Sequence, residues 1–385
     1  MIRTRALTKD FVVSRTRTVH AVRGISLDVE PGELVAVLGP NGAGKTTTLR
    51  MLTTLIQPTS GTAEVAGYDV ADRPDRVRAA IGYVGQGGAG GAAQHVRDEL
   101  VTQGEIYGLD RRTARTRAAE LLEALDLTEQ ADRKVESLSG GQKRRLDVAV
   151  GLVHAPSLLF LDEPSTGLDP HNRANLWEHI LRMRTAAAEP MTIVLTTHYL
   201  DEADTFAERV IVVDHGQVIA DDTADALKAE LAGDLVTLRV PAGQTAALAA
   251  IAERAPGTRS VRVSDGSVPA ADAAVRAQGA GRAQAAGRAD GVEQTVEIRT
   301  ADGPGATPGL LRAADAAGVE VRRIDVARPT LDDVFLGLTG RSLRETGVDG
   351  AGADPDEPAS TPATTSGTTT SATTTSTTTK KEVPA

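Results

Sequence analysis

The 385-residue chain contains no cysteine, few aromatic residues, no excess of positive charge and no long apolar segment. Without cysteine there can be no disulfide, thiolate metal site, iron–sulfur cluster or thiol nucleophile, which fits a reducing compartment. Trp, Tyr and Phe make up 2% of the residues, and this disfavours aromatic platforms for nucleic acid. The net charge of −10 opposes binding to phosphate backbones, so we expect no nucleic-acid partner.

The most apolar segment, from Val148 to Leu161, is too short to cross a bilayer and contains His154 and Pro156. The N-terminal residues lack the apolar core and the small-residue cleavage site of a secretory signal. We therefore expect the chain to stay inside the cell. Any membrane-spanning part of its assembly is expected to come from another chain.

Apolar strand candidates alternate with helical segments up to about Asp222, a pattern that predicts an α/β domain with a parallel sheet. The clearest candidates are Leu34–Gly39, Ser157–Glu163 and Thr192–His198. Each is a nearly continuous apolar run that ends in polar residues, which is typical of strands buried on both faces. Ligands gather at the carboxyl ends of such strands, so the polar residues there are the candidates for function.

The chain divides into three predicted parts. Residues 1–228 form the α/β domain, with an inserted helical subdomain at about 87–155 in which Leu121, Leu122 and Leu125 share one helical face. Residues 229–341 form a small α+β C-terminal domain with a low-complexity insert at about 269–291. Residues 342–385 are rich in Thr, Ser and Pro and cannot bury enough apolar surface to fold, so we expect a disordered tail.

A glycine-rich loop joins the first clear strand to a helical segment. The run GPNGAGKTT contains Gly39, Gly44, Lys45 and Thr46 at the phosphate-loop spacing. Glycines let the backbone curl so that successive N–H groups point at one phosphate, beside the positive end of a helix. We expect Lys45 to reach the β- and γ-phosphates, Thr46 to ligate Mg²⁺, and Thr47 to lie at the α- and β-phosphates. The alternative is a glycine-rich turn with a solvated lysine.

Two further strand candidates end in residues suited to hydrolysis at that loop. The run SLLFLDEP ends in Asp162, expected to hold Mg²⁺, and Glu163, expected to orient or deprotonate the attacking water. His198 closes the run TIVLTTH and is expected to contact the γ-phosphate and to hold Glu163 and the water in line. The alternatives are an acidic turn and a structural histidine.

The run LSGGQKRRLDVAVGLVHAPSLLFLDEPSTGLDP resembles the ATP-binding cassette (ABC) family. LSGGQ is similar to the family's signature motif, which implies that Ser139, Gly140, Gly141 and Gln142 complete the ATP site of the opposite subunit in a head-to-tail dimer. STGLDP is similar to the loop that crosses the dimer interface and supplies Asp169. The alternative for LSGGQ is an N-capped start of a helix.

The resemblance implies an ABC-type P-loop ATPase fold that binds ATP and Mg²⁺. This fold has a RecA-like parallel sheet core, an antiparallel β subdomain and an inserted helical subdomain. The resemblance also implies that Gln86 contacts Mg²⁺ or the water and that Phe11 stacks on adenine, with a buried core phenylalanine as the alternative. Asn41 and Gly42 complete the predicted nucleotide-binding set.

The run RPTLDDVFLGLTGR, from Arg328 to Arg341, resembles the C-terminal segment of daunorubicin-resistance-type ATPases, which pair with separate ABC-2 permeases. This implies an ATP-hydrolysing subunit of an export complex for a drug-like or other amphipathic compound. Such a subunit forms a homodimer with ATP and lies peripherally on the cytoplasmic face of the cell membrane. The chain departs from the family pattern in the segment Gly87–Ala93, which consists of glycine and alanine. A permease helix is expected to dock there.

Two other functions use the same motifs. A soluble ABC ATPase that acts on ribosomes or nucleic acid needs no permease, but the single cassette and the acidic charge disfavour it. An importer ATPase shares every catalytic residue, and only the C-terminal domain argues against it.

Overall fold

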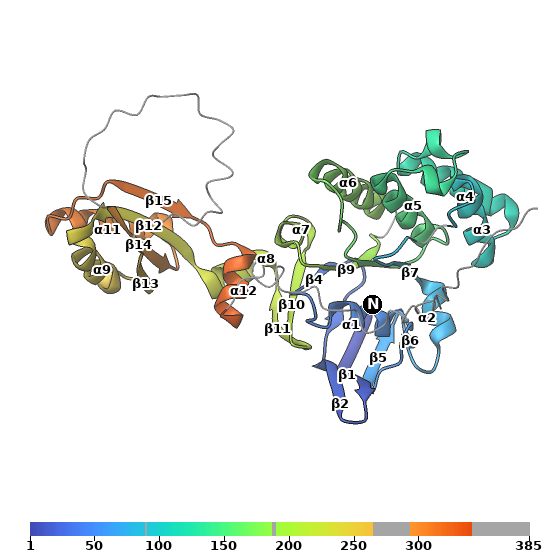
Figure 1. The fold of residues 1–385 in the computed structure, drawn as a ribbon, viewed down its shortest axis with the longest axis horizontal. Helices are drawn as coiled ribbons and strands as arrows, with labels where there is room; N and C mark the ends of the chain where they lie inside the picture. The colour runs from blue at the N-terminus through green and yellow to red at the C-terminus, as the bar shows by residue number, and fades with distance from the viewer. Residues whose placement is uncertain (89–90, 187–189, 265–292, 341–385) are drawn as a thin grey trace, which may run out of the picture. The chain divides into compact units, whose positions relative to one another are not determined.

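The computed structural model describes residues 1–88, 91–186, 190–264 and 293–340 (Figure 1). The predicted insert at 269–291, the predicted tail at 342–385 and positions 89–90 of the segment Gly87–Ala93 lie outside these residues. Within the described ranges, none of the helices has the length and hydropathy that a membrane span requires.

A mixed sheet forms the centre of the N-terminal domain. Its strands are β4 (Leu34–Leu38), β7 (Ile81–Val84), β8 (Leu158–Asp162), β9 (Thr192–Thr197), β10 (Arg209–Asp214) and β11 (Gln217–Asp222). They lie in the order β11-β10-β4-β9-β8-β7, and neighbours are parallel except for the β10–β11 hairpin. Strands β4, β8 and β9 are buried throughout and confirm the three strands predicted from their apolar runs.

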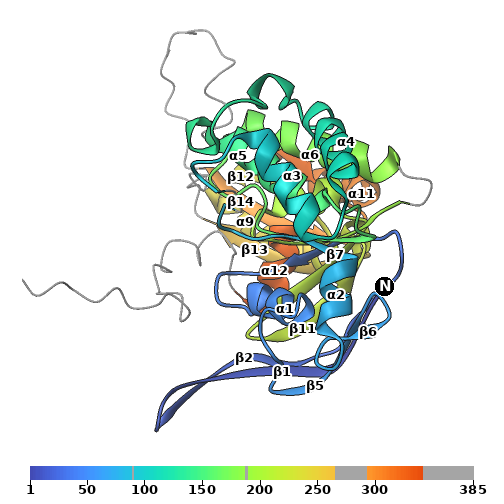
Figure 2. The same ribbon diagram turned by 90° about the vertical axis from the view of Figure 1, so that its right-hand side faces the viewer.

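Two hydrophobic cores cover the two faces of this sheet. Figure 2 shows helices on both sides of it. In β8, Leu159 and Leu161 belong to one core, whereas Leu158 and Phe160 belong to the other, because successive strand residues point to opposite faces. The first core includes residues of α3 (Val96–Ile106), α4 (Arg111–Ala124), α5 (Gly140–Leu152) and α6 (Pro170–Ala186). The second includes residues of α1 (Lys45–Leu52), α2 (Pro74–Ala80) and the antiparallel sheet.

The antiparallel sheet pairs strands from the first 69 residues. Its strands are β1 (Ile2–Ser14), β2 (Arg17–Ile25), β3 (Asp28–Val29), β5 (Ser60–Val65) and β6 (Tyr68–Asp69). They lie in the order β2-β1-β5-β6, and β3 also pairs with β1. This is the antiparallel β subdomain that the family resemblance implies.

Helices replace strands between Val96 and Val153, as the sequence predicts. Leu121, Leu122 and Leu125 at the end of α4 are all buried in the first core, which confirms their shared face. Asp110 caps the start of α4 by accepting hydrogen bonds from the backbone N–H groups of Arg112 and Thr113.

The C-terminal part contains a separate antiparallel sheet. Its strands are β12 (Asp234–Pro241), β13 (Thr258–Ser264), β14 (Glu293–Thr300) and β15 (Arg323–Ala327), in the order β13-β14-β12-β15. Helices α9 (Thr245–Arg254) and α11 (Gly303–Ala316) contribute to the core on one face, where Leu248 and Leu310 pack with Leu238 and Ile298.

The last described helix, α12 (Leu331–Thr339), does not join that small core. Leu331, Val334 and Phe335 are buried in the first core of the N-terminal domain, with residues of α8 (Ala224–Leu227). A capping box starts α12: the Thr330 hydroxyl accepts from the Asp333 backbone N–H, and the Asp333 carboxylate accepts from the Thr330 backbone N–H.

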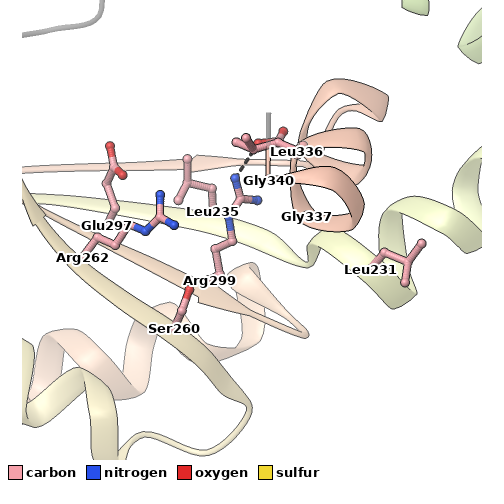
Figure 3. A pocket seen from close by; sticks show the side chains of 10 residues that line it. Leu231, Leu235, Ser260, Arg262, Glu297, Arg299, Leu336, Gly337 and Gly340 are labelled. Carbon is pink, nitrogen blue, oxygen red and sulfur yellow. Dashed lines mark hydrogen bonds and ion pairs between the residues drawn. The ribbon is translucent and has the colours of Figure 1, made fainter. Parts of the chain in front are cut away.

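A cavity of about 490 Å³ lies between α12 and strands β12, β13 and β14 (Figure 3). Its charged lining residues are Arg262, Arg299, Glu297 and Asp333, and Arg299 donates a hydrogen bond to Asp333. Because its two cations face two carboxylates, the cavity has no excess of either charge.

We expect Phe335→Ala to lower the free energy of unfolding by about 3 kcal/mol, because it leaves a cavity in the first core. Leu336→Ala is the matched control, since Leu336 is 37% exposed on the same helix. Thermal unfolding followed by circular dichroism measures both changes. Equal losses in the two variants would contradict the packing of α12 described above.

The Asp333 carboxylate should also make stability depend on pH. Burial acts to raise its pKa, but the Thr330 N–H and Arg299 outweigh burial and hold the pKa below its ordinary value. A lowered folded-state pKa stabilises the fold above the unfolded pKa, and this stabilisation disappears as pH falls through the folded pKa. Asp333→Asn should therefore cost about 1 kcal/mol at pH 7 and progressively less below about pH 4. Urea unfolding at several pH values tests this, and the same pH profile for the exposed control Asp315→Asn would overturn it.

Candidate functional site

The glycine-rich loop runs from the end of β4 into the first turn of α1, as predicted. Gly44 has a φ of +99°, and a Cβ there would lie 2.5 Å from the Ala21 carbonyl oxygen. A Cβ at Gly39 would lie 2.2 Å from the Val213 carbonyl oxygen. Only glycine fits at these two positions. The backbone N–H groups of the loop therefore lie next to the N-terminus of α1.

Lys45 is 4% exposed and lies beneath this loop. Its Nζ donates to the carbonyl oxygens of Gly39 at 2.7 Å and Pro40 at 3.1 Å, and lies 3.8 Å from Oε1 of Glu163. Burial lowers the pKa of Lys45, while Glu163 and Asp162 act in the opposite direction. The lysine thus holds the loop closed and brings a positive charge to the end of β8.

Asp162, at the end of β8, is 1% exposed and joins three elements. Its Oδ1 accepts hydrogen bonds from the hydroxyls of Thr46 at 3.0 Å and Thr196, at the end of β9, at 2.6 Å. Gln86, which follows β7, donates from Nε2 to the Thr46 hydroxyl at 3.4 Å. Burial raises the pKa of Asp162, and the bonds from Thr196 and Thr46 oppose that effect.

This group of side chains suits a hard cation. A hydroxyl, a carboxylate and an amide that can present its oxygen by rotation are the oxygen donors that Mg²⁺ accepts. Among the described residues, no set of three His, Cys, Asp or Glu side chains could hold a metal. One carboxylate with neutral oxygens fits an ion that completes its coordination with phosphates and water.

Glu163 lies beside this group with its side chain 12% exposed. Its Oε2 lies 3.3 Å from Nδ1 of His198 and accepts a hydrogen bond from the Thr166 hydroxyl at 3.2 Å. Burial acts to raise the pKa of Glu163, but His198, Lys45 and Thr166 together hold it below its ordinary value. A carboxylate that stays ionised and lies beside a histidine can orient or deprotonate a water molecule.

The backbone at Glu163 is unusual. Its φ is +47°, a region that non-glycine residues rarely adopt, and its N–H donates to the Thr196 carbonyl at 3.1 Å. The turn points the side chain away from the sheet ladder and towards Lys45 and His198.

The signature residues lie at the start of α5. The Ser139 hydroxyl accepts from the Gln142 N–H, and the Gln142 side chain accepts from the Ser139 N–H, which forms a capping box. A Cβ at Gly141 would lie 2.6 Å from Oδ1 of Asn172, so the Asn172 side chain would have to shift to admit one. Asn172 also donates to Asp169 from its backbone N–H at 2.9 Å and from Nδ2 at 2.6 Å. Signature and Asp169 are therefore neighbours within one subunit.

The structure brings Lys45, Thr46, Gln86, Asp162, Glu163 and His198 together, while the roles of all the predicted site residues stay predictions. Phe11 is half-buried on β1, with the Lys9 Nζ 5.1 Å from its ring centroid. Thr47 is half-buried on α1, while Asn41 and Gly42 are exposed in the loop, and Gly140 is exposed beside Gly141.

Sequence reasoning missed three residues that organise the site: Thr196, Asn172 and Arg144. The Arg144 guanidinium donates to backbone carbonyls beside Gln86 and at the Glu163 turn. Thr196 precedes His198 in a strand-end run of polar residues, a signal that could have found it. Arg144 and Asn172 carry no such signal, because each looks like an ordinary polar residue of a helix until the fold shows its neighbours.

Comparisons with known proteins point to one family. A family model described as ABC transporter matches residues 22–166. The chain is 42% identical to daunorubicin resistance ATP-binding protein DrrA2 of Streptomyces coeruleorubidus, over 85% of this chain and 92% of that protein. It is 34% identical to linearmycin resistance ATP-binding protein LnrL of Bacillus subtilis, over 84% of this chain and 95% of that protein. A solved dimeric structure of a bacterial ABC transporter cassette is similar with a TM-score of 0.53 at 25% identity, over 58% of this chain and 98% of that one.

We expect Lys45→Ala to abolish detectable ATP binding, because the loop loses both its internal tether and the positive charge for the phosphates. Lys134→Ala, at an exposed lysine that pairs with Glu136, is the control and should bind as the parent does. Titration calorimetry with ATP measures both. Unchanged affinity in Lys45→Ala would contradict the phosphate-loop role.

Proposed function

The chain belongs to the ABC transporter family of ATP-binding subunits, and we propose that two copies clamp two ATP molecules and power export through a separate membrane permease. Its activity is ATP hydrolysis coupled to transport. The observation that carries the proposal is the approach of Lys45 and His198 to the Glu163 carboxylate, beside Thr46, Gln86 and Asp162.

In the proposed reaction each side chain has one task. The loop N–H groups and Lys45 bind the phosphates, with Asn41 and Gly42 in the loop and Thr47 in the first turn of α1 beside them. Glu163 accepts a proton from the attacking water, and His198 orients Glu163 from 3.3 Å. Thr46, Gln86 and Asp162 would hold Mg²⁺, which supplies positive charge against the phosphate oxygens. Phe11 stacks on the adenine.

The second half of each ATP site comes from the other copy in this proposal. Ser139 to Gln142 form a capped helix start, and a helix N-terminus attracts phosphate. Asp169, which accepts two hydrogen bonds from Asn172, crosses the interface. The dimeric state of a similar cassette supports this arrangement. ATP binding then closes the dimer, and hydrolysis reopens it.

The partner in this proposal is an ABC-2-type permease, and the chain lies peripherally on the cytoplasmic face of the cell membrane. Relatives that are named for resistance to daunorubicin and linearmycin support export of a drug-like, amphipathic compound. The match to these relatives over most of their length includes the C-terminal part, which favours an exporter over an importer.

The test is purification of tagged Glu163→Gln from detergent-solubilised native membranes with ATP and Mg²⁺. This variant keeps the phosphate loop but loses the base, so turnover should fall at least about 100-fold and an ATP-dependent dimer should accumulate. Mass spectrometry should find a multi-span membrane protein in stoichiometric amount.

Glu136→Gln, at an exposed glutamate on the protein surface, is the matched control and should turn over ATP like the parent. Parental turnover in Glu163→Gln would remove Glu163 from the role of base. Recovery only in the soluble fraction, together with ribosomes or nucleic acid, would overturn the exporter proposal.

A further inference from the structure

A single buried guanidinium joins the signature helix to the catalytic strand ends. Arg144, in the second turn of α5, is 8% exposed. It donates from Nε to the Pro164 carbonyl at 2.5 Å and from Nη1 to the Gly85 carbonyl at 2.6 Å. Its Nη2 donates to the carbonyls of Asp162 at 3.2 Å and Glu163 at 3.3 Å.

These four acceptors belong to two segments that carry proposed catalytic residues. Gly85 directly precedes Gln86, and the other three acceptors form the turn that holds Asp162 and Glu163. A planar guanidinium fixes its donors in one rigid fork, so it also fixes the spacing of the backbone groups that it binds. A lysine ammonium has three donors at one point and cannot span the same set.

The Arg144 guanidinium is buried, so its hydrogen bonds are not those of a solvent-exposed side chain. A buried cation is costly unless hydrogen bonds and a counter-charge compensate it. Asp147, one turn further along α5 and 6% exposed, lies 3.7 Å from Nη1 of Arg144. The helix thus supplies both the cation and its counter-ion, and directs the cation towards the end of β8.

The same helix begins at the signature. Ser139 is five residues before Arg144, about 7.5 Å along the helix axis, so any shift of the helix start moves the guanidinium with it. We propose that Arg144 is a positioning residue that transmits the position of the signature helix to the Glu163 turn and to Gln86. This inference rests on the proposed function, because it requires the signature to engage an ATP held by a second copy.

The consequence is a link between the two ATP-binding surfaces of one subunit. When Ser139 and Gly141 meet the partner's ATP, Arg144 draws the carbonyls of Glu163 and Gly85 into their final positions. A subunit whose signature is empty would hold its own Glu163 and Gln86 less firmly.

The first measurement is steady-state ATP hydrolysis by the full chain, compared with Arg144→Lys and Arg145→Lys. Arg144→Lys keeps the charge but loses the fork, so we expect kcat to fall roughly tenfold or more with the KM for ATP within about twofold. In the described structure Arg145 donates to none of the four carbonyls, and its variant should match the parent. A purely structural role would instead lower the unfolding temperature without this separation of kcat from KM.

The second measurement needs no turnover. In the Glu163→Gln background, hydrogen exchange followed by mass spectrometry reports backbone protection with and without ATP and Mg²⁺. We expect ATP to protect both residues 138–144 and residues 162–168. Adding Arg144→Lys should keep the first protection and remove the second.

Protection of both segments in the Arg144→Lys background would overturn the inference while leaving the proposed function intact. Absence of ATP-dependent protection at residues 138–144 in the Glu163→Gln parent would mean that the signature does not engage ATP. That result would overturn the proposed dimer, and the inference with it.

Discussion

Compensation of buried charge beneath the phosphate loop is the constraint on which the site depends. Lys45 and Asp162 are each less than 5% exposed, and Glu163 lies beside them. Each charged group would be costly to bury alone. Together they offset one another, and backbone carbonyls and threonine hydroxyls satisfy the remaining donors and acceptors. The arrangement therefore holds only as a unit, with loop, strand ends and helices in their present positions.

The parallel sheet makes this unit possible. Strands β4, β7, β8 and β9 all point the same way, so the residues that follow them meet at one edge. Each strand contributes a different chemistry there: a backbone loop, an amide, two carboxylates, and a threonine with a histidine. The positive φ of Glu163 serves the same arrangement. It turns the chain sharply away from β8, so that this carboxylate lies beside Lys45 and His198.

The sequence allowed prediction of those parts of the fold and site that local pattern specifies. Fully buried parallel strands are continuous apolar runs, so β4, β8 and β9 could be located directly. The phosphate loop follows from spacing, because backbone curvature demands glycine at fixed positions. The antiparallel sheet came only from the family resemblance, since its half-exposed strands lack a clear pattern. Contacts between distant segments, such as that of Arg144 with Gly85, could not be predicted. Arginine is also common on the solvent-exposed faces of helices, so the sequence does not show that this one is buried.

Helix α12 illustrates the same limit at the level of packing. Its apolar residues indicate a buried face, but periodicity does not say which core that face enters. The chain passes through the whole C-terminal sheet before Leu331, Val334 and Phe335 join the core of the first domain. Arg299 in β14 also binds Asp333 at the start of the helix. Because one helix is fastened both to the small sheet and to the ATPase core, a change in either would alter the stability of α12. Its dual attachment thus makes α12 a structural connection between the C-terminal sheet and the nucleotide-binding domain.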